Sequence, residues 1–107
     1  MRTRGVLVLI TALLRYSLLR AADRNVEPIV SRIHREAVES SAIRTVGYSR
    51  HLHALEIEFH DGLIYRYEAV PPPTYHGLVS SESKARFYNQ NIRGKYHCLR
   101  VKPVHGR

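Results

Sequence analysis

The residues best suited to chemistry in this chain lie between Ser83 and Arg107, where seven Lys or Arg side chains occur without a single Asp or Glu. Cations at this density are typical of a surface that meets phosphate groups, and aromatic rings among them can stack on unpaired bases. One interpretation is a surface that binds nucleic acid. The phosphate contacts would come from six residues: Lys84, Arg86, Arg93, Lys95, Arg100 and Lys102. The stacking candidates are Tyr65 and Phe87.

The same pattern also fits an ordinary amphipathic helix. Basic residues on a helix face opposite the core are usually just solvated, and tyrosine rings are often core residues. For the face that carries Arg86 and Arg93, the two interpretations stay open with equal weight. For any particular tyrosine as a stacking platform, the core interpretation is favoured.

Patterns for catalysis or metal binding are weak. His51 and His53 flank one leucine, but no Asp, Glu or Cys nearby completes a ligand set, so a turn with two surface histidines is favoured. Cys98 and its neighbour His97 would point to opposite faces of an extended segment, which separates a nucleophile from its base. We predict no enzymatic activity, no metal, no cofactor and no small-molecule substrate.

Composition limits the class of protein. The chain has 107 residues, a net charge of +8 and a pI near 10.2. This charge favours an anionic partner, which could be nucleic acid, a membrane surface or an acidic protein. A single cysteine cannot form an internal disulfide, so a reducing cytoplasm is the expected compartment.

Residues 1–39 form a separate N-terminal extension by composition, with seven Arg and no Lys. Its apolar stretch, residues 5–14, lies behind Arg2 and Arg4 as in a secretory signal, but Arg15 interrupts the stretch. It is also shorter than the roughly 20 residues that span a membrane. Three interpretations stay open: a spurious upstream extension, an export signal over residues 1–22, or a segment on a membrane surface. The last two would place the protein outside the cytoplasm or at a membrane.

The end of this extension has a helical pattern. Pro28 could begin a helix, and Ile29, Ile33 and Ala37 recur at intervals of four residues. We expect a short helix near residues 29–39.

A hairpin is predicted from residue 55 to residue 67. Leu55, Ile57 and Phe59 alternate with glutamates, so one face of the first strand is apolar and the other acidic. A two-residue turn would mix polar and apolar residues on both faces, whereas a three-residue loop over residues 60–62, with Gly62 in the left-handed region, keeps them apart. The predicted pairs are Phe59 with Leu63, Ile57 with Tyr65, Leu55 with Tyr67, and Glu56 with Arg66.

A helix over residues 84–93 follows, bracketed by Ser83 as N-cap and Gly94 at its C-terminus. Residues 74–80 should form a brief helical turn after three prolines, and residues 96–101 a last extended segment. The predicted fold is a small α+β domain. It has an antiparallel three-stranded β-meander packed against one or two short helices, with a C-terminal extended segment.

Residues 41–101 resemble the KTSC domain. The resemblance rests on Ala42-Ile-Arg-Thr-Val-Gly-Tyr48, Leu55-Glu-Ile-Glu-Phe59, Tyr65-Arg-Tyr67 and Ser83-Lys-Ala-Arg-Phe-Tyr-Asn89 in this order. One departure is Ala85-Arg-Phe-Tyr-Asn89, where similar sequences often have Gly-Arg-Phe-Phe-Asn. The resemblance implies a domain over residues 40–102, with a tail at 103–107. The family is named for the C-terminus of some lysyl-tRNA synthetases and has no established activity.

We therefore expect a small non-catalytic binding module whose partner is RNA, either tRNA-like or single-stranded. The alternative is a protein-interaction or appended structural module. That alternative would use the edge of the sheet, with Glu56 and Glu58 recruiting a basic partner.

Overall fold

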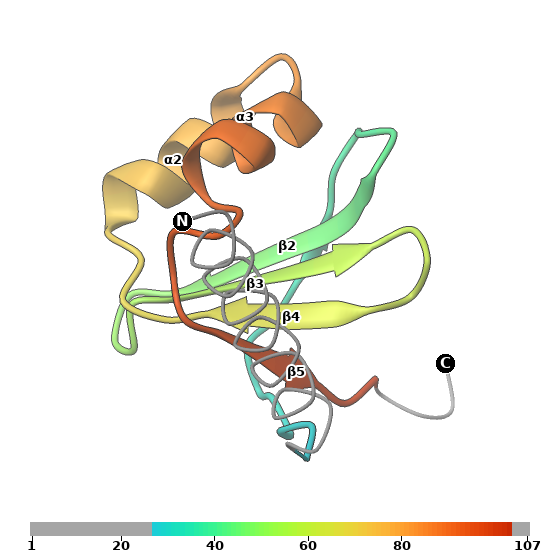
Figure 1. The fold of residues 1–107 in the computed structure, drawn as a ribbon, viewed down its shortest axis with the longest axis vertical. Helices are drawn as coiled ribbons and strands as arrows, with labels where there is room; N and C mark the ends of the chain where they lie inside the picture. The colour runs from blue at the N-terminus through green and yellow to red at the C-terminus, as the bar shows by residue number, and fades with distance from the viewer. Residues whose placement is uncertain (1–26, 104–107) are drawn as a thin grey trace, which may run out of the picture.

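The computed structural model describes residues 27–103. Within this range, five antiparallel strands form one sheet in chain order, and two helices cover one of its faces (Figure 1). The strands are β1 (Glu36–Ala37), β2 (Ile43–Ser49), β3 (Ala54–Phe59), β4 (Ile64–Tyr67) and β5 (Cys98–Val101). The helices are α2 (Pro72–Ser80) and α3 (Lys84–Asn91). The α+β class is confirmed, but the sheet has five strands in place of the predicted three. The C-terminal extended segment is its fifth strand.

The β3–β4 hairpin has the predicted register. Ile57 lies opposite Tyr65, Leu55 opposite Tyr67 and Glu56 opposite Arg66. The backbone N–H of Phe59 donates to the carbonyl of Leu63 at 2.9 Å, which closes the three-residue loop. Gly62 has φ +92°, the left-handed conformation that this turn requires and that glycine adopts without strain.

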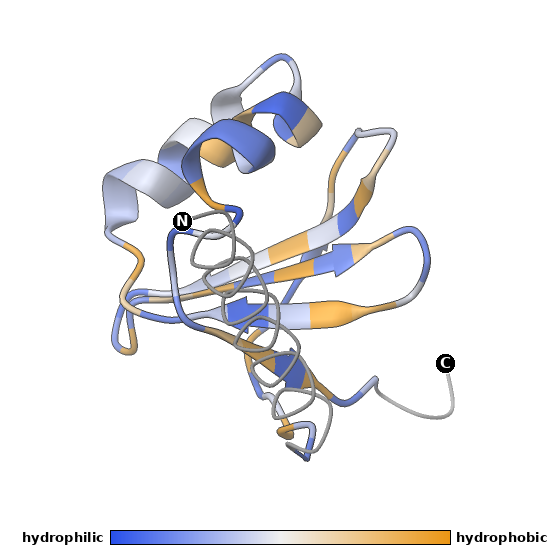
Figure 2. Ribbon diagram, in the orientation of Figure 1, coloured by the Kyte–Doolittle hydropathy of each residue, from blue (hydrophilic) through white to orange (hydrophobic). Residues whose placement is uncertain are grey.

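The core lies between the sheet and the helices. Leu78 of α2 and Ile92, just after α3, are fully buried against residues from the strands. Hydrophobic and hydrophilic residues alternate along the strands (Figure 2), as expected where one face packs on a core. The complete buried cluster is Ile43, Val46, Leu55, Ile57, Tyr67, Val70, Leu78 and Ile92.

The N-terminus of α3 is capped as predicted, and Gly94 is left-handed as predicted but lies two residues past the C-cap, Ile92. The Ser83 hydroxyl accepts a hydrogen bond from the backbone N–H of Arg86, and Gly94 has φ +73°. Helix α3 ends at Asn91, two residues before the predicted end, because the backbone of Ile92 is not helical. The N–H of Ile92 still donates to the carbonyl of Tyr88. Helix α2 has nine residues, so the predicted brief turn is a full helix.

Residues 27–37 form an extended segment, here called the strap. The prediction of a helix near residues 29–39 is wrong. Ser31, Ile33 and Arg35 are partly buried while Arg32 and His34 are exposed, a period of two residues that is typical of extended chain. At one end of the strap, Ile29 pairs in parallel with Val101 of β5; at the other, β1 pairs with β2. The strap therefore crosses the face of the sheet opposite the helices. The signal predicted over residues 1–22 lies outside the described residues.

Candidate nucleic-acid interface

Tyr65 and Arg100 face each other across the pair β4–β5. The guanidinium carbon of Arg100 lies 6.0 Å from the centre of the Tyr65 ring, at the limit for attraction between a cation and an aromatic face. Phe59 packs against this ring in an edge-on arrangement, with 6.2 Å between the ring centres. Tyr65 is only partly buried. The register of the sheet thus fixes a partly exposed ring with a cation beside it.

Tyr88 of α3 links this ring to the helix. Its hydroxyl lies 2.7 Å from the hydroxyl of Tyr67, and its ring packs edge-on against Phe59. Burial raises the pKa of Tyr88, although the hydrogen bond with Tyr67 and the charge of Arg93 both act to lower it. Burial, with the hydrogen bond to Tyr88, raises the pKa of Tyr67 far above its usual range. Both hydroxyls therefore stay neutral at physiological pH.

These contacts define one surface, which we call the tyrosine–arginine surface. Tyr65, Arg93 and Arg100 all lie near Tyr88 or contact its neighbours, and both arginines are exposed. Neither arginine forms an ion pair within residues 27–103. The surface offers two available guanidinium groups and a ring held at a fixed angle.

The other predicted contact residues are placed less favourably. The amino group of Lys84 donates to the carbonyl of Ser81 at 3.1 Å, across the loop that joins the helices. Phe87 fills the contact between α2 and α3: a Cβ atom added to Gly77 would lie 2.6 Å from its ring. Its packing role competes with stacking. Three further predicted cations are exposed and have no described contact with the tyrosine–arginine surface: Arg86, Lys95 and Lys102.

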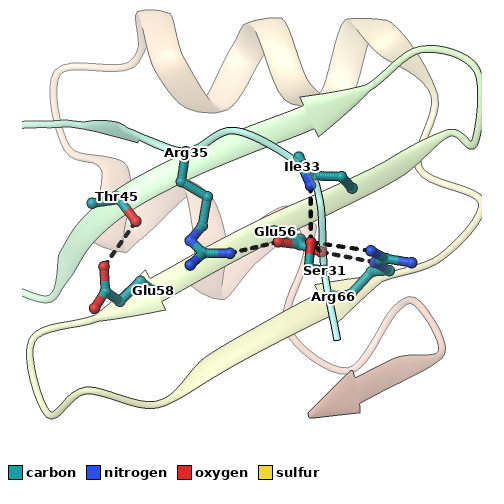
Figure 3. Close-up of polar contacts among 7 residues, drawn as sticks. All are labelled: Ser31, Ile33, Arg35, Thr45, Glu56, Glu58 and Arg66. Atoms are coloured by element: carbon teal, nitrogen blue, oxygen red, sulfur yellow. Dashed lines mark hydrogen bonds and ion pairs between the residues drawn. The ribbon is translucent and has the colours of Figure 1, made fainter. Parts of the chain in front are cut away.

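Glu56 has a role that the sequence did not reveal. Its side chain is fully buried and accepts hydrogen bonds from Arg35 at 2.7 Å and Arg66 at 2.8 Å (Figure 3). The hydroxyl of Ser31 donates to the same carboxylate. The prediction that Glu56 could recruit a basic partner is therefore wrong, because the strap of this same chain already covers it.

Glu58, the second predicted acidic contact, is half-buried and accepts a hydrogen bond from the Thr45 hydroxyl at 3.0 Å. The sequence signal for the buried network was the spacing of Ser31, Ile33 and Arg35 at intervals of two residues, which places all three on one side of an extended chain. A helical assignment concealed that alternation.

Two findings concern other classes of site. In residues 27–103, no group of three His, Cys, Asp or Glu side chains is arranged to hold a metal ion, and His51 and His53 are exposed in the β2–β3 turn. No helix of this described range has the length and apolar character to cross a membrane.

The meander and the two helices that cover it define the chain as a small α+β module. The family model of the KTSC domain matches residues 39–96. The chain therefore belongs to the KTSC domain family.

Two related proteins and one solved structure match part of this chain. The crystal structure of a KTSC domain protein from Yersinia pestis has a TM-score of 0.62 and 35% identity, covering 65% of this chain and 99% of that one. An uncharacterized protein of Stutzerimonas stutzeri is 40% identical over 63 residues, which are 59% of this chain and 89% of that protein. A lysine–tRNA ligase of Nostoc punctiforme is 36% identical over 58 residues, which are 54% of this chain but 10% of the ligase.

Proposed function

We propose that this protein is a non-catalytic module that binds RNA, tRNA-like or single-stranded, through the tyrosine–arginine surface. The observation that carries the proposal is the placement of Arg100 over the partly exposed ring of Tyr65. An unpaired base can stack on such a ring, because every base has an aromatic face. A guanidinium group beside the ring is then positioned for the phosphate that follows that base.

Electrostatics around the surface supports an anionic ligand. From Ser83 to the end of the chain there is no acidic residue, and Arg93 extends the positive surface from β5 to the end of α3. Glu68 is the carboxylate close to this region, and it is paired with His97 at 2.6 Å. Lys95 and Lys102 would add weaker phosphate contacts at the periphery.

A relative gives independent support. The homologous segment in Nostoc punctiforme belongs to a protein described as a lysine–tRNA ligase, so one relative of this domain occurs within a protein named for tRNA. We place RNA binding in the cytoplasm. The chain has one cysteine and therefore no internal disulfide that would need an oxidising compartment.

The test is the salt dependence of RNA affinity. The full chain would be titrated against tRNA and against a single-stranded oligonucleotide at several salt concentrations. Each phosphate contact that is removed should reduce the slope of log affinity against log salt by about 0.7 to 0.9. We expect Arg93→Ala/Arg100→Ala to lose two contacts, and Tyr65→Leu to weaken single-strand binding with an unchanged slope.

A matched control separates this surface from general positive charge. Arg32→Ala/Arg50→Ala removes the same charge from exposed residues outside the tyrosine–arginine surface. It should leave the slope close to that of the unmodified protein. Equal slopes for the two double variants would refute the proposal, and a further loss in Arg86→Ala would extend the surface along α3.

A further inference from the structure

Strand β2 extends beyond the strand that borders it. β1 pairs only with Thr45 and Val46, but β2 continues to Ser49. Within residues 27–103, the last three residues of β2 therefore have β3 as their single partner strand. A strand with a free side presents backbone groups that can pair with another extended chain.

The strap leaves this edge at Gly47. A Cβ atom on Gly47 would lie 2.3 Å from the carbonyl oxygen of His34, so the strap passes directly over this residue on its way across the sheet. It cannot continue alongside Tyr48 and Ser49. The place next to these two residues is left open by the path of the chain itself.

An open groove of about 740 Å³ lies at this place. Its volume is in the range of known ligand pockets. Its lining includes Val30 and Leu52, the two large hydrophobic residues that are most exposed in the described chain, at 76% and 55%. Tyr48 and Tyr75, whose rings stack in parallel at 4.6 Å, form another wall. Apolar side chains and a strand edge thus meet in one groove.

The charges beside the groove favour an acidic ligand. Arg32 lines it, and Arg50 is close enough to Tyr48 to oppose the effect of burial, which raises the pKa of that hydroxyl. Neither arginine forms a hydrogen bond or ion pair within residues 27–103. The single carboxylate in the lining is Glu36, which lies 3.8 Å from His34.

We infer that this groove binds an extended peptide of a partner protein in which apolar and acidic residues alternate, and that the peptide pairs with β2 at Tyr48 and Ser49. The backbone of the peptide would continue the line of β1. Its apolar side chains would contact Val30, Leu52 and Tyr75, and its carboxylates would lie near Arg32 and Arg50. This site is separate from the tyrosine–arginine surface, and the inference is independent of RNA binding.

Peptide titration followed by nuclear magnetic resonance tests the inference. The probe is a labelled hexapeptide that alternates Glu and Val, added to the full chain. We expect the amide signals of Gly47, Tyr48 and Ser49 to shift, with a dissociation constant of roughly 1 mM or lower. The same peptide with lysine in place of glutamate, or with N-methylated valines, should bind at least about tenfold more weakly.

Variants identify the groove as the binding place. Val30→Ser/Leu52→Ser changes exposed side chains, so the fold should persist while the probe binds about tenfold more weakly. Arg93→Ala/Arg100→Ala is the control and should leave peptide binding unchanged. Absent shifts at residues 47–49, or equal binding of the lysine peptide, would overturn the inference.

Other occupants of the groove give different results. A doubled mass in solution that Val30→Ser/Leu52→Ser abolishes would mean that a second copy fills the groove. A gain in peptide affinity in Val6→Asp/Val8→Asp would mean that residues 5–14 of this chain compete for it. Shifts at residues 47–49 on adding RNA would assign the groove to RNA. The doubled mass and the RNA-induced shifts contradict the peptide inference, and competition by residues 5–14 would make this segment of the chain, in place of a partner protein, the occupant.

Discussion

The two faces of the sheet are covered by different parts of the chain and by different interactions. On one face, α2 and α3 pack apolar side chains and tyrosine rings on the strands. On the other face, the strap packs a serine and an arginine around one carboxylate. Glu56 and Ile57 are neighbours in β3, point to opposite faces and are both fully buried. A polar residue in an alternating strand is therefore not necessarily a solvent-facing residue.

The two faces also differ in how many different sequences could cover them. An apolar face accepts many side chains of similar volume. A buried carboxylate is costly unless cations and hydrogen-bond donors surround it, so few segments could cover Glu56. This difference explains how a short extended segment can have a defined path across the sheet.

The largest expected effect is at Glu56. Glu56→Gln should lower the free energy of unfolding by about 3–5 kcal/mol, because it leaves Arg35 and Arg66 without their anion. Urea denaturation at neutral pH measures this change. The matched variant Glu58→Gln, at a half-buried carboxylate, should cost about 1 kcal/mol or less. Equal losses would show that the strap face does not depend on the buried charge.

The next prediction compares one glycine on each face. Gly47→Ala should cost about 1–3 kcal/mol, since the new methyl group meets the backbone oxygen of His34. Gly77→Ala meets the ring of Phe87, a side chain that can rotate, and the helix gains up to about 1 kcal/mol from the replacement of glycine. Gly47→Ala should also speed cleavage by trypsin after Arg32 and Arg35. A larger loss of unfolding free energy in Gly77→Ala than in Gly47→Ala would contradict this prediction.

The smallest expected effect tests the helix face at high pH. The pKa values of Tyr67 and Tyr88 are raised above 10.0 in the folded protein, so the folded state keeps these protons longer than the unfolded state. The resulting stability is complete below pH 10 and falls as the pH rises above it, by up to about 1.4 kcal/mol per pH unit for Tyr67 and by less for Tyr88, whose hydroxyl solvent partly screens.

Tyr67→Phe should therefore cost about 1 kcal/mol at neutral pH and show a shallower loss above pH 10. Urea midpoints measured between pH 8 and pH 11 provide the comparison. Tyr75→Phe, outside the hydrogen-bonded pair, should follow the unmodified protein. An identical alkaline slope in Tyr67→Phe would contradict the role of the pair.

The sequence predicted the elements whose signals are local. The register of the β3–β4 hairpin follows from alternation around Gly62, and the start of α3 follows from Ser83. The strap also has a local signal, the alternation of residues 31–35, but a helical pattern competes with it, and contacts with Glu56, a residue far along the chain, favour the extended form. The short strand β1 is likewise defined by its partner β2, whereas β5 was predicted as an extended segment and only its pairing with β4 was not.

The candidate site was predicted in part for the same reason. The basic residues were evident from composition, but the contact between Arg100 and Tyr65 depends on the pairing of β4 with β5. The packing of Phe87 against Gly77 depends on how the two helices meet. Composition named the available groups, and tertiary structure decided which of them lie together.

The pairing of Ile29 with Val101 has a consequence for how the protein is assembled during synthesis. The backbone N–H of Ile29 donates to the carbonyl of Arg100 at 2.8 Å, and that of Lys102 donates to Ile29 at 2.7 Å. The hairpins of the meander can form as they leave the ribosome, since their contacts are local. The Ile29 end of the strap can take its final place only after β5 has emerged, whereas the end that carries Arg35 pairs with β2 and does not depend on β5.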